Sequence, residues 1–370
     1  MPRFAMRGAM TQPKLELLSV LVVEDSGFIR TVLTATLRAI GIGRVEGVAS
    51  GAAAIRWLEE RRAALPAGTA PVDLILSDLV MPEVNGLMLL RWIRYSPKSP
   101  DKFLPVLMLS GAADRQYVEQ ARDLGATDFI AKPFSAQTIA SRLLFAIARQ
   151  RRFVLAKGYF GPDRRRADKP VAMDCRTTAP SEILVVHSAS KARGIDRFPV
   201  IQFELPNRLG AKAGLAPRDP VPTLPPEVLA AAEEEIQNRA GDYAVWIGAE
   251  VEEMGRRVDR LPREPEAVPG LLAQVNRAAH EMRGQGGIFG YPLITLIAKS
   301  LYEATRGVRN DRTAVVSVGE HLLFKAHVDA IRAVMTGRVS GDGGTTGQQL
   351  LASLEVAKRK HAKAAEAGRG

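Results

Sequence analysis

Residues 72–78 read VDLILSD, a short and nearly continuous apolar run that ends in an aspartate. Three further runs of the same texture are SVLVVED at 19–25, LPVLMLS at 104–110 and TDFIAK at 127–132. Apolar runs of this length without alternation are typical of parallel strands that helices cover on both faces. The pattern therefore predicts buried parallel strands in the first half of the chain.

Helical patterns separate these strand-like runs. The stretch SGFIRTVLTATLRAIG at 26–41 repeats apolar residues at helical spacing and closes on Gly41, a common helix stop. The same spacing returns at 139–147. Alternation of strand and helix predicts an α/β domain with a doubly wound, five-stranded parallel sheet over residues 18–152.

Length and composition limit the class of protein. The 370 residues suffice for two domains that each bury a core, and the one cysteine, Cys175, excludes an intramolecular disulfide. The opening MPRFAMRGAM lacks the apolar run of a secretion signal, and no apolar stretch approaches the roughly 20 residues that cross a bilayer. We therefore expect a cytoplasmic protein with no membrane partner. The formal net charge of +11 favours anionic partners without identifying one.

Two regions of different composition follow the α/β region. Residues 153–225 are rich in proline, glycine and charge, so we expect a basic linker with at most one small hairpin. Four amphipathic helical segments come next, near residues 227–261, 267–285, 291–306 and 313–337. Their short joints predict an all-α, antiparallel four-helix bundle over residues 226–340. For residues 341–370 we expect a mobile tail.

Polar residues end the predicted strands of the first region. In a doubly wound sheet, ligands bind beyond the carboxyl ends of the strands. The polar residues at those ends are Glu24, Asp25, Asp78, Ser110 and Lys132. Three adjacent carboxylates repel one another unless a cation neutralises them, and Mg²⁺ prefers such oxygen ligands. Because a bound Mg²⁺ can also neutralise phosphoryl oxygens, we interpret Asp78 as a nucleophile toward a phosphoryl group.

Two motifs carry a family resemblance. Asp78 lies in LSDLVMPEVNGL at 76–87, and Lys132 begins the motif KPF. With the acidic pair and Ser110, these residues make the region resemble a response regulator receiver domain. The resemblance implies a flavodoxin-like fold, an aspartyl phosphate on Asp78 formed with Mg²⁺, and Phe129 as an aromatic switch residue. It also implies a sensor histidine kinase or other phosphohistidine donor, and a signalling phosphoacceptor rather than an enzyme.

The stretch RAAHEMRGQGGIFG at 277–290 places His280 within a helical pattern. At about 100° per residue, one apolar face is formed by Val268, Leu271, Val275, Ala279 and Met282. His280 lies roughly opposite, so we expect it to face solvent or a partner. The residues expected on the same side are Asn276, Gly284 and Gly287, with Arg283 at the edge. An exposed imidazole can attack a phosphoryl group near neutral pH, and Arg283 could stabilise the added negative charge.

The same stretch resembles the signature of a histidine phosphotransfer domain. That signature runs histidine, any residue, leucine, lysine, glycine, five residues, glycine; here it is matched by His280, Met282, Arg283, Gly284 and Gly290. Met for Leu and Arg for Lys are departures of size and shape, and the extra glycines raise the question of whether the helix continues. The resemblance implies a relay in which His280 exchanges phosphoryl groups with another receiver domain.

A second hypothesis is a binding module switched by phosphorylation of Asp78 alone. The helical bundle or the basic run Arg164, Arg165 and Arg166 would then dock a protein partner or nucleic acid. No helix-turn-helix pattern follows this run, so nucleic acid is the weaker expectation.

Overall fold

The computed structural model describes residues 12–66, 70–111, 115–156, 158–163, 183–186, 200–203, 205–217, 219–309 and 316–367. Cys175 and the run Arg164 to Arg166 lie outside the described residues. The chain divides into two compact units, Met1–Glu235 and Ile236–Gly370. Each unit is described by itself.

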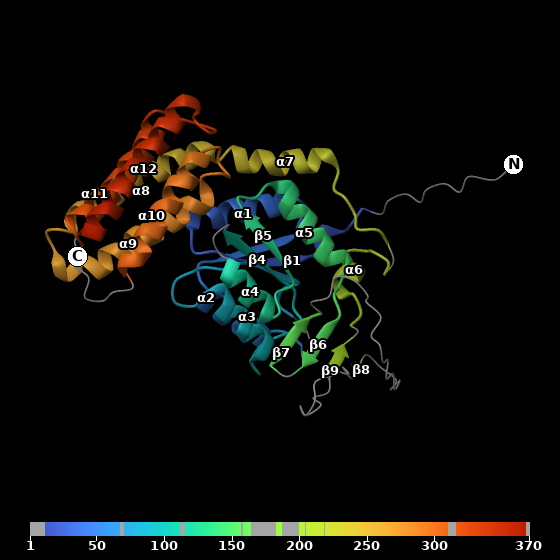
Figure 1. The fold of residues 1–370 in the computed structure, drawn as a ribbon. Helices are drawn as coiled ribbons and strands as arrows, with labels where there is room; N and C mark the ends of the chain where they lie inside the picture. Colours follow the sequence, from blue (N-terminus) through green and yellow to red (C-terminus); the bar gives the residue numbers. More distant parts are fainter. Residues whose placement is uncertain are drawn as a thin grey trace. The chain divides into compact units, whose positions relative to one another are not determined.

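The first unit contains the predicted parallel sheet (Figure 1). Its strands are β1 (Ser19–Val23), β2 (Arg44–Val48), β3 (Leu74–Asp78), β4 (Val106–Gly111) and β5 (Asp128–Lys132). They pair in the order β2-β1-β3-β4-β5, all in parallel. Every residue of β1 and β3 is buried, because helices cover both faces of the sheet. The predicted five-stranded, doubly wound fold is confirmed.

Five helices connect and cover these strands: α1 (Gly27–Ala39), α2 (Gly51–Ala63), α3 (Gly86–Tyr95), α4 (Arg115–Asp123) and α5 (Ala136–Ala148). A short 3₁₀ turn, η1 (Leu15–Leu17), precedes β1. Ser26, Ser50 and Ser135 begin α1, α2 and α5 by accepting a hydrogen bond from a first-turn backbone N–H. These caps fix where each helix starts, just after the carboxyl end of the preceding strand.

The described part of residues 153–225 is folded, unlike the linker that we expected. It forms an antiparallel sheet in the order β7-β6-β9-β8, and a short helix, α6 (Arg208–Lys212), follows this sheet. The strands are β6 (Phe153–Ala156), β7 (Tyr159–Pro162), β8 (Ile183–Val186) and β9 (Val200–Phe203). The expectation of one hairpin at most was wrong because four-residue strands leave no periodic pattern, and two of their three pairings join residues distant in sequence.

An aromatic cluster attaches this second sheet to the α/β region. Phe153, Phe160 and Phe203 surround Phe103, which precedes β4, with ring centroids 5.1, 5.4 and 5.5 Å from it. Edge-on aromatic pairs at this spacing stabilise beyond their buried area by about 0.5–1.5 kcal/mol each. The second sheet is therefore a packed extension of the first unit.

Arg94 of α3 holds the same junction from inside. Its side chain is buried and donates hydrogen bonds to the carbonyl oxygens of Gly125, Lys102 and Leu104 at 2.8–3.0 Å. The guanidinium carbon also lies 5.2 Å from the ring centroid of Phe153. Burial lowers the pKa of Arg94 to about 10, which leaves it charged at neutral pH. One cation thus joins α3, the loops that precede β4 and β5, and strand β6.

The C-terminal region is helical. It comprises α7 (Pro226–Gln237), α8 (Ala240–Arg260), α9 (Val268–Gln285), α10 (Pro292–Arg309), α11 (Val318–Thr336) and α12 (Gly344–Ala367), with a 3₁₀ turn, η2 (Pro265–Ala267), before α9. The predicted helix at 227–261 is two helices, and most of α7 belongs to the first unit. Within the second unit α8 contacts α9 and α11, and α10 contacts α9 and α11. The expected mobile tail instead contains α12, which contacts α11 and buries Leu354.

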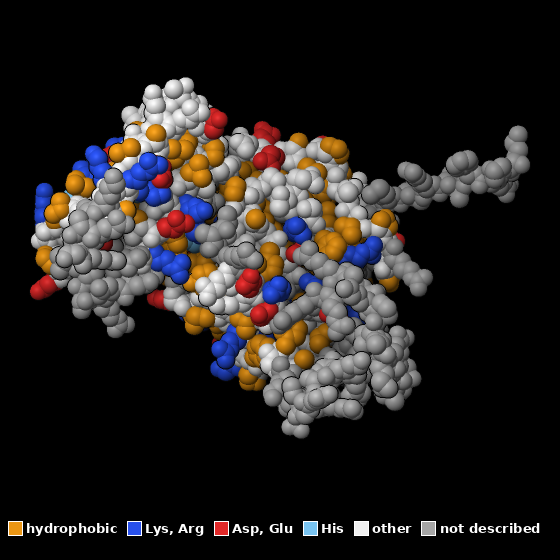
Figure 2. All heavy atoms as spheres, viewed as in Figure 1, with side chains coloured by type: hydrophobic (Ala, Val, Ile, Leu, Met, Phe, Trp, Pro, Cys, Tyr) orange, Lys and Arg blue, Asp and Glu red, His pale blue; other side chains and the backbone are white. Residues whose placement is uncertain are grey.

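Charge is distributed without a single dominant patch on the face in Figure 2, where basic, acidic and hydrophobic side chains are interspersed. Among the described residues, none of the helices combines the length and apolarity needed to cross a membrane.

Replacing Arg94 with methionine should lower the free energy of unfolding by about 2–4 kcal/mol, because three buried carbonyl oxygens lose a charged donor. Chemical denaturation measures this change. Arg91→Met is the matched control, since Arg91 is exposed on the same helix. Equal stability of the two variants would contradict the structural role assigned to Arg94.

Candidate functional site

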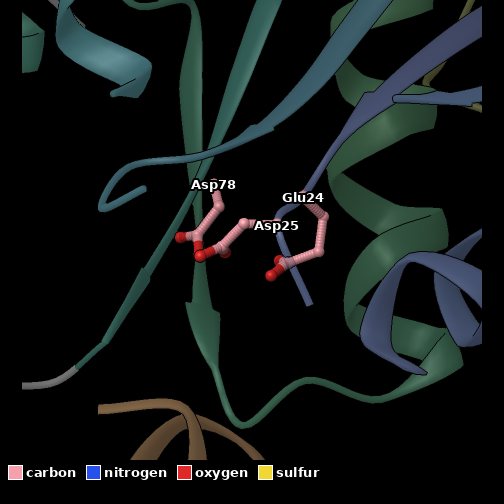
Figure 3. A group of neighbouring side chains, drawn as sticks. All are labelled: Glu24, Asp25 and Asp78. Atoms are coloured by element: carbon pink, nitrogen blue, oxygen red, sulfur yellow. The ribbon is translucent and has the colours of Figure 1, made fainter. Parts of the chain in front are cut away.

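Three carboxylates converge at the carboxyl ends of β1 and β3 (Figure 3). One oxygen from each of Glu24, Asp25 and Asp78 lies within 4.8 Å of the other two. Glu24 and Asp78 are buried, and Asp25 is half-buried. Such a cluster of hard oxygen donors has the chemistry that Mg²⁺ prefers. The sequence-predicted ligand set therefore comes together and fits a divalent cation.

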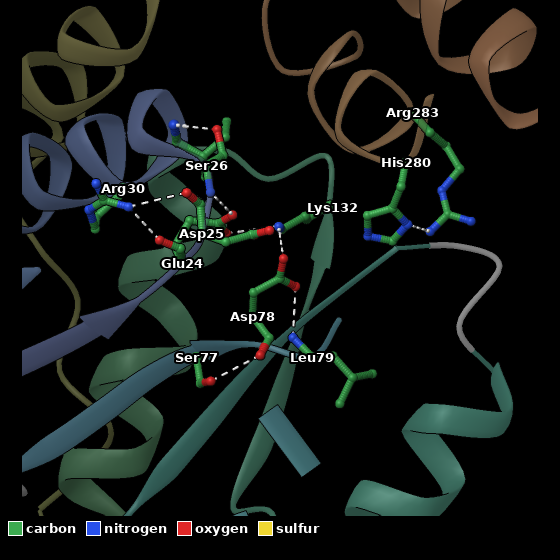
Figure 4. Close-up of polar contacts among 11 residues, drawn as sticks. Glu24, Asp25, Ser26, Arg30, Ser77, Asp78, Leu79, Lys132, His280 and Arg283 are labelled. Carbon is green, nitrogen blue, oxygen red and sulfur yellow. Dashed lines mark hydrogen bonds and ion pairs between the residues drawn. The ribbon is translucent and has the colours of Figure 1, made fainter. Parts of the chain in front are cut away.

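Lys132, at the end of β5, supplies a positive charge within the cluster (Figure 4). Its Nζ lies 2.9 Å from Glu24 Oε2 and 2.9 Å from Asp78 Oδ2. The other oxygen of Asp78, Oδ1, accepts a hydrogen bond from the backbone N–H of Leu79 at 2.7 Å. One ammonium facing three carboxyl groups leaves the cluster short of positive charge, which favours a further cation.

The backbone around the cluster is fixed by contacts that sequence reasoning missed. Arg30 of α1 donates from Nη1 to the Glu24 carbonyl oxygen at 2.6 Å, and the Ser26 N–H donates to Glu24 Oε1 at 3.3 Å. Gly86 approaches so closely that an added Cβ would lie 2.2 Å from the Asp78 carbonyl oxygen. The sequence shows Gly86 in the motif LSDLVMPEVNGL. Only the tertiary structure shows that the Asp78 backbone lies too close for a side chain at this position.

The pKa values of Glu24, Asp25 and Lys132 are all raised, but for different reasons. Burial is the largest cause of the rise in the pKa of Glu24 to about 8, and the neighbouring carboxylates add to it. The pKa of Asp25 is raised for the same reasons. Burial alone would lower the pKa of Lys132, but the charges of Asp78 and Glu24 outweigh it and raise that pKa. Lys132 is therefore a permanent cation at neutral pH.

Ser110 lies on β4, the strand next to β3, and Phe129 lies on β5, the strand next to β4. Ser110 is buried near the end of β4, where Asp78 pairs with the preceding residue, Leu109. Phe129 of β5 pairs with Met108 and packs, partly buried, against the core that α2, α3 and α4 form with the sheet. The structure thus places the predicted hydroxyl and the predicted aromatic residue on adjacent strands.

His280 and Arg283 lie together on α9 but not on an exposed face. His280 is half-buried, Arg283 is buried, and Arg283 Nη2 is 3.1 Å from His280 Nδ1. Asn276, expected on the solvent side, is buried and donates to the Tyr302 carbonyl oxygen and to Thr305 Oγ1. The expected exposure of Asn276 was wrong because α9 packs against both α8 and α10, which buries more of its circumference than one apolar stripe.

The glycines after His280 do not interrupt its helix. Helix α9 continues to Gln285, and Gly286 follows as its C-cap residue. An added Cβ on Gly286 would lie 2.7 Å from the Tyr291 carbonyl oxygen, so the small residue permits a tight connection to α10. The helix therefore supports His280 for more than a turn beyond it.

Comparisons with known proteins address the first unit. The family model for the response regulator receiver domain matches residues 20–144. A probable transcriptional regulatory protein of Picosynechococcus is 32% identical over 131 residues, which are 35% of this chain and 49% of that protein. The chain thus spans about half the length of that relative. Chemotaxis protein CheY-3 of Vibrio cholerae is 29% identical over 126 residues, 34% of this chain and 88% of that protein.

The solved structures that are similar to this chain cover about the same share of it as these relatives do. Chemotaxis protein CheY4 of Vibrio cholerae is 31% identical, with a TM-score of 0.30, over 34% of this chain and 95% of that one. The receiver domain of the sensor histidine kinase PA1611 from Pseudomonas aeruginosa is 32% identical, with a TM-score of 0.28, over 35% and 94%. That structure is described with a magnesium ion in its active-site cleft. The family match ends at residue 144, so it does not test the C-terminal helices.

The affinity of the carboxylate cluster for a divalent cation should rise as pH increases from about 5 to 8. Glu24 keeps its proton in the metal-free protein until about pH 8, and a ligand must be deprotonated to bind. In the metal-free protein the same raised pKa lowers the free energy of unfolding as pH rises from 4.5 toward 8, since the native state then holds more protons than the unfolded state. Isothermal titration calorimetry with Mg²⁺ at several pH values measures the affinity. An affinity independent of pH would contradict the raised pKa.

Proposed function

Because residues 20–144 form a response regulator receiver domain, we propose that Asp78 accepts a phosphoryl group from a phosphohistidine donor such as a sensor histidine kinase. The observation that carries this proposal is the contact of Lys132 with both Asp78 and Glu24 inside the three-carboxylate cluster. Glu24, Asp25 and Asp78 would hold Mg²⁺. The bound ion would neutralise charge on the transferred phosphoryl oxygens.

The chain's own residues would prepare Asp78 for the transfer. The Leu79 N–H holds Oδ1 at 2.7 Å and Lys132 holds Oδ2 at 2.9 Å, which fixes the plane of the carboxylate. An oxygen of Asp78 attacks phosphorus, the phosphorus–nitrogen bond of the donor breaks, and the imidazole leaves with the electron pair. Lys132 then exchanges part of its contact with the carboxylate for a contact with the new phosphoryl oxygens. The chain acts here as a phosphoacceptor that promotes its own modification, not as an enzyme with turnover.

Ser110 and Phe129 would transmit the change. A phosphoryl group on Asp78 offers the Ser110 hydroxyl a new acceptor, and inward movement of Ser110 leaves space next to the ring of Phe129. Phe129 is partly buried on β5, so its movement would alter the surface near β4 and β5. We propose that a partner protein in the cytoplasm binds this surface when Asp78 is phosphorylated.

For the second unit we propose phosphotransfer through His280. Three observations support it: the signature residues around His280, the guanidinium of Arg283 beside the ring, and the packing of α8, α9, α10 and α11 each against two others. We interpret that packing as the four-helix bundle of a phosphotransfer domain. A receiver domain, in this chain or in another protein, would be the exchange partner.

One observation favours the alternative, a binding module that Asp78 phosphorylation controls. Large apolar side chains are exposed on the helical unit, including Val245 and Val318 at 77% and Leu322 at 59%. Exposed apolar side chains of this kind can form a docking surface for a protein partner. In this alternative His280 takes no phosphoryl group, and nucleic acid or a protein would bind the helices or residues 153–225.

Phosphorylation with a radiolabelled donor tests both functions. Label on Asp78 should be base-labile and should be lost in Asp78→Asn, whereas label on His280 should be acid-labile, base-stable and lost only in His280→Gln. His361→Gln is the matched control, because His361 lies on α12 outside the signature.

The outcomes separate the two units. Base-labile label that persists in Asp78→Asn would overturn the receiver assignment. Wild-type protein that never carries acid-labile label, even when mixed with phosphorylated receiver domains, would overturn the relay and leave the binding module.

A further inference from the structure

The guanidinium of Arg283 determines which nitrogen of His280 carries the proton. Arg283 Nη2 lies 3.1 Å from His280 Nδ1, and Figure 4 shows this contact as a dashed line. An arginine side chain has only donors, so Nδ1 must be the acceptor in this hydrogen bond. A neutral imidazole that accepts at Nδ1 carries its proton on Nε2.

Tyr302 of α10 holds this arrangement from the neighbouring helix. The guanidinium carbon of Arg283 lies 4.8 Å from the Tyr302 ring centroid, and the His280 ring centroid lies 5.4 Å from it at an interplanar angle of 51°. A cation over a tyrosine ring at this distance is attracted by the negative face of the ring. The tyrosine ring therefore contacts both partners of the hydrogen bond.

The backbone of Tyr302 is itself tied to α9. Asn276, one turn before His280, donates to the Tyr302 carbonyl oxygen at 3.0 Å and to Thr305 Oγ1 at 2.8 Å. Asn276 is buried, and its amide therefore joins the two helices at the level of His280. This link fixes the position of the tyrosine relative to the histidine and the arginine.

The tautomer that the Arg283 contact requires is the wrong one for attack through Nε2. A nitrogen that bears a proton has no lone pair for a nucleophilic attack, so Nε2 can attack only when the proton is on Nδ1. That form cannot coexist with the Arg283 contact, because two donors would then face each other. We propose that Arg283, held over Tyr302, is a tautomer lock that keeps His280 non-nucleophilic at Nε2 until an anionic phosphoryl group draws the guanidinium away. The proposal rests on His280 phosphotransfer and deepens it.

The steps balance without a further reactant. The guanidinium moves from Nδ1 to the oxygens of an incoming aspartyl phosphate, a charge-assisted contact stronger than the one to a neutral nitrogen. Water delivers a proton to Nδ1 and removes the proton from Nε2. The Nε2 lone pair attacks phosphorus, and the bond from phosphorus to the aspartate oxygen breaks with its electron pair, leaving a carboxylate. The resulting imidazolium loses its Nδ1 proton to water, and Nδ1 can again accept from Arg283.

In this scheme Tyr302 is a positioning residue. Its ring attracts the guanidinium in either location and limits how far it can move from His280. The lock would also make His280 selective, because a donor must carry enough negative charge to displace the guanidinium before the reactive tautomer forms.

The tautomer of His280 can be observed directly by ¹⁵N–¹H correlation spectroscopy of the full-length protein labelled at its histidine nitrogens. The spectrum is recorded at a pH well above the ordinary histidine pKa, and the His280 signals are assigned by their loss in His280→Gln. We expect wild type to show predominantly the Nε2–H form. Arg283→Leu should raise the ratio of the Nδ1–H to the Nε2–H form roughly fivefold or more, as expected when a charged hydrogen-bond donor is lost.

Matched variants separate the lock from general packing effects. Arg277→Leu removes an exposed arginine from the same helix and should leave the ratio unchanged. Tyr302→Leu should shift the ratio toward that of Arg283→Leu, whereas Tyr302→Phe keeps the ring and should retain the wild-type ratio. A predominant Nδ1–H form in wild type, or an unchanged ratio in Arg283→Leu, would overturn the lock. The same holds if Tyr302→Phe and Tyr302→Leu behave alike.

This readout needs no phosphorylation, so failure of the lock and failure of the relay are distinguishable. Failure of the relay shows as absence of acid-labile label on His280, whatever the tautomer. Failure of the lock shows in the spectrum, whether or not His280 is labelled.

Discussion

The ammonium group of Lys132 between Glu24 and Asp78 is the interaction on which the first unit's chemistry depends. It joins the ends of three strands, β1, β3 and β5, and so requires the sheet order that places β1 beside β3 and β5 on the far side of β4. It also leaves three carboxyl groups with a single cation, a charge imbalance that a divalent ion would correct. The contact of Lys132 with Asp78 Oδ2 and the hydrogen bond from the Leu79 N–H to Oδ1 together hold both oxygens of the Asp78 carboxylate.

A second buried cation, Arg94, lies at the end of the sheet where β4 and β5 begin. Arg94 faces carbonyl oxygens rather than carboxylates, and it lies against Phe153 of the second sheet. Gly125 makes this junction possible, since its φ is +91° and an added Cβ would lie 2.8 Å from the Phe160 carbonyl oxygen. Arg94 joins neutral carbonyl dipoles of the backbone, whereas Lys132 neutralises part of the charge of two carboxyl groups.

His280 illustrates why a helical pattern alone does not establish exposure. The apolar stripe of α9 was identified correctly, since Val275, Ala279 and Met282 are buried. A second neighbouring helix, however, covers the flank that carries Asn276, and Asn276 there satisfies its amide against Tyr302 and Thr305. The polar side chain of Asn276 therefore forms hydrogen bonds to another helix and does not face solvent. A residue between two packed helices is buried by the neighbouring helix. Its hydrogen-bond partners therefore belong to another segment of the chain.

The sequence by itself determined four of the five parallel strands residue by residue, the polar residues at their ends and the helical character of residues 226–340. Each of these depends on local apolar periodicity or on strand-end position, which neighbouring residues encode. Only the tertiary structure decided that residues 153–225 contain a second sheet, that Gly86 must lack a side chain beside Asp78, and that Arg283 contacts Nδ1 of His280. The sheet and the Gly86 approach are non-local packing, while the Arg283 contact depends on a side-chain direction that Tyr302 of another helix supports.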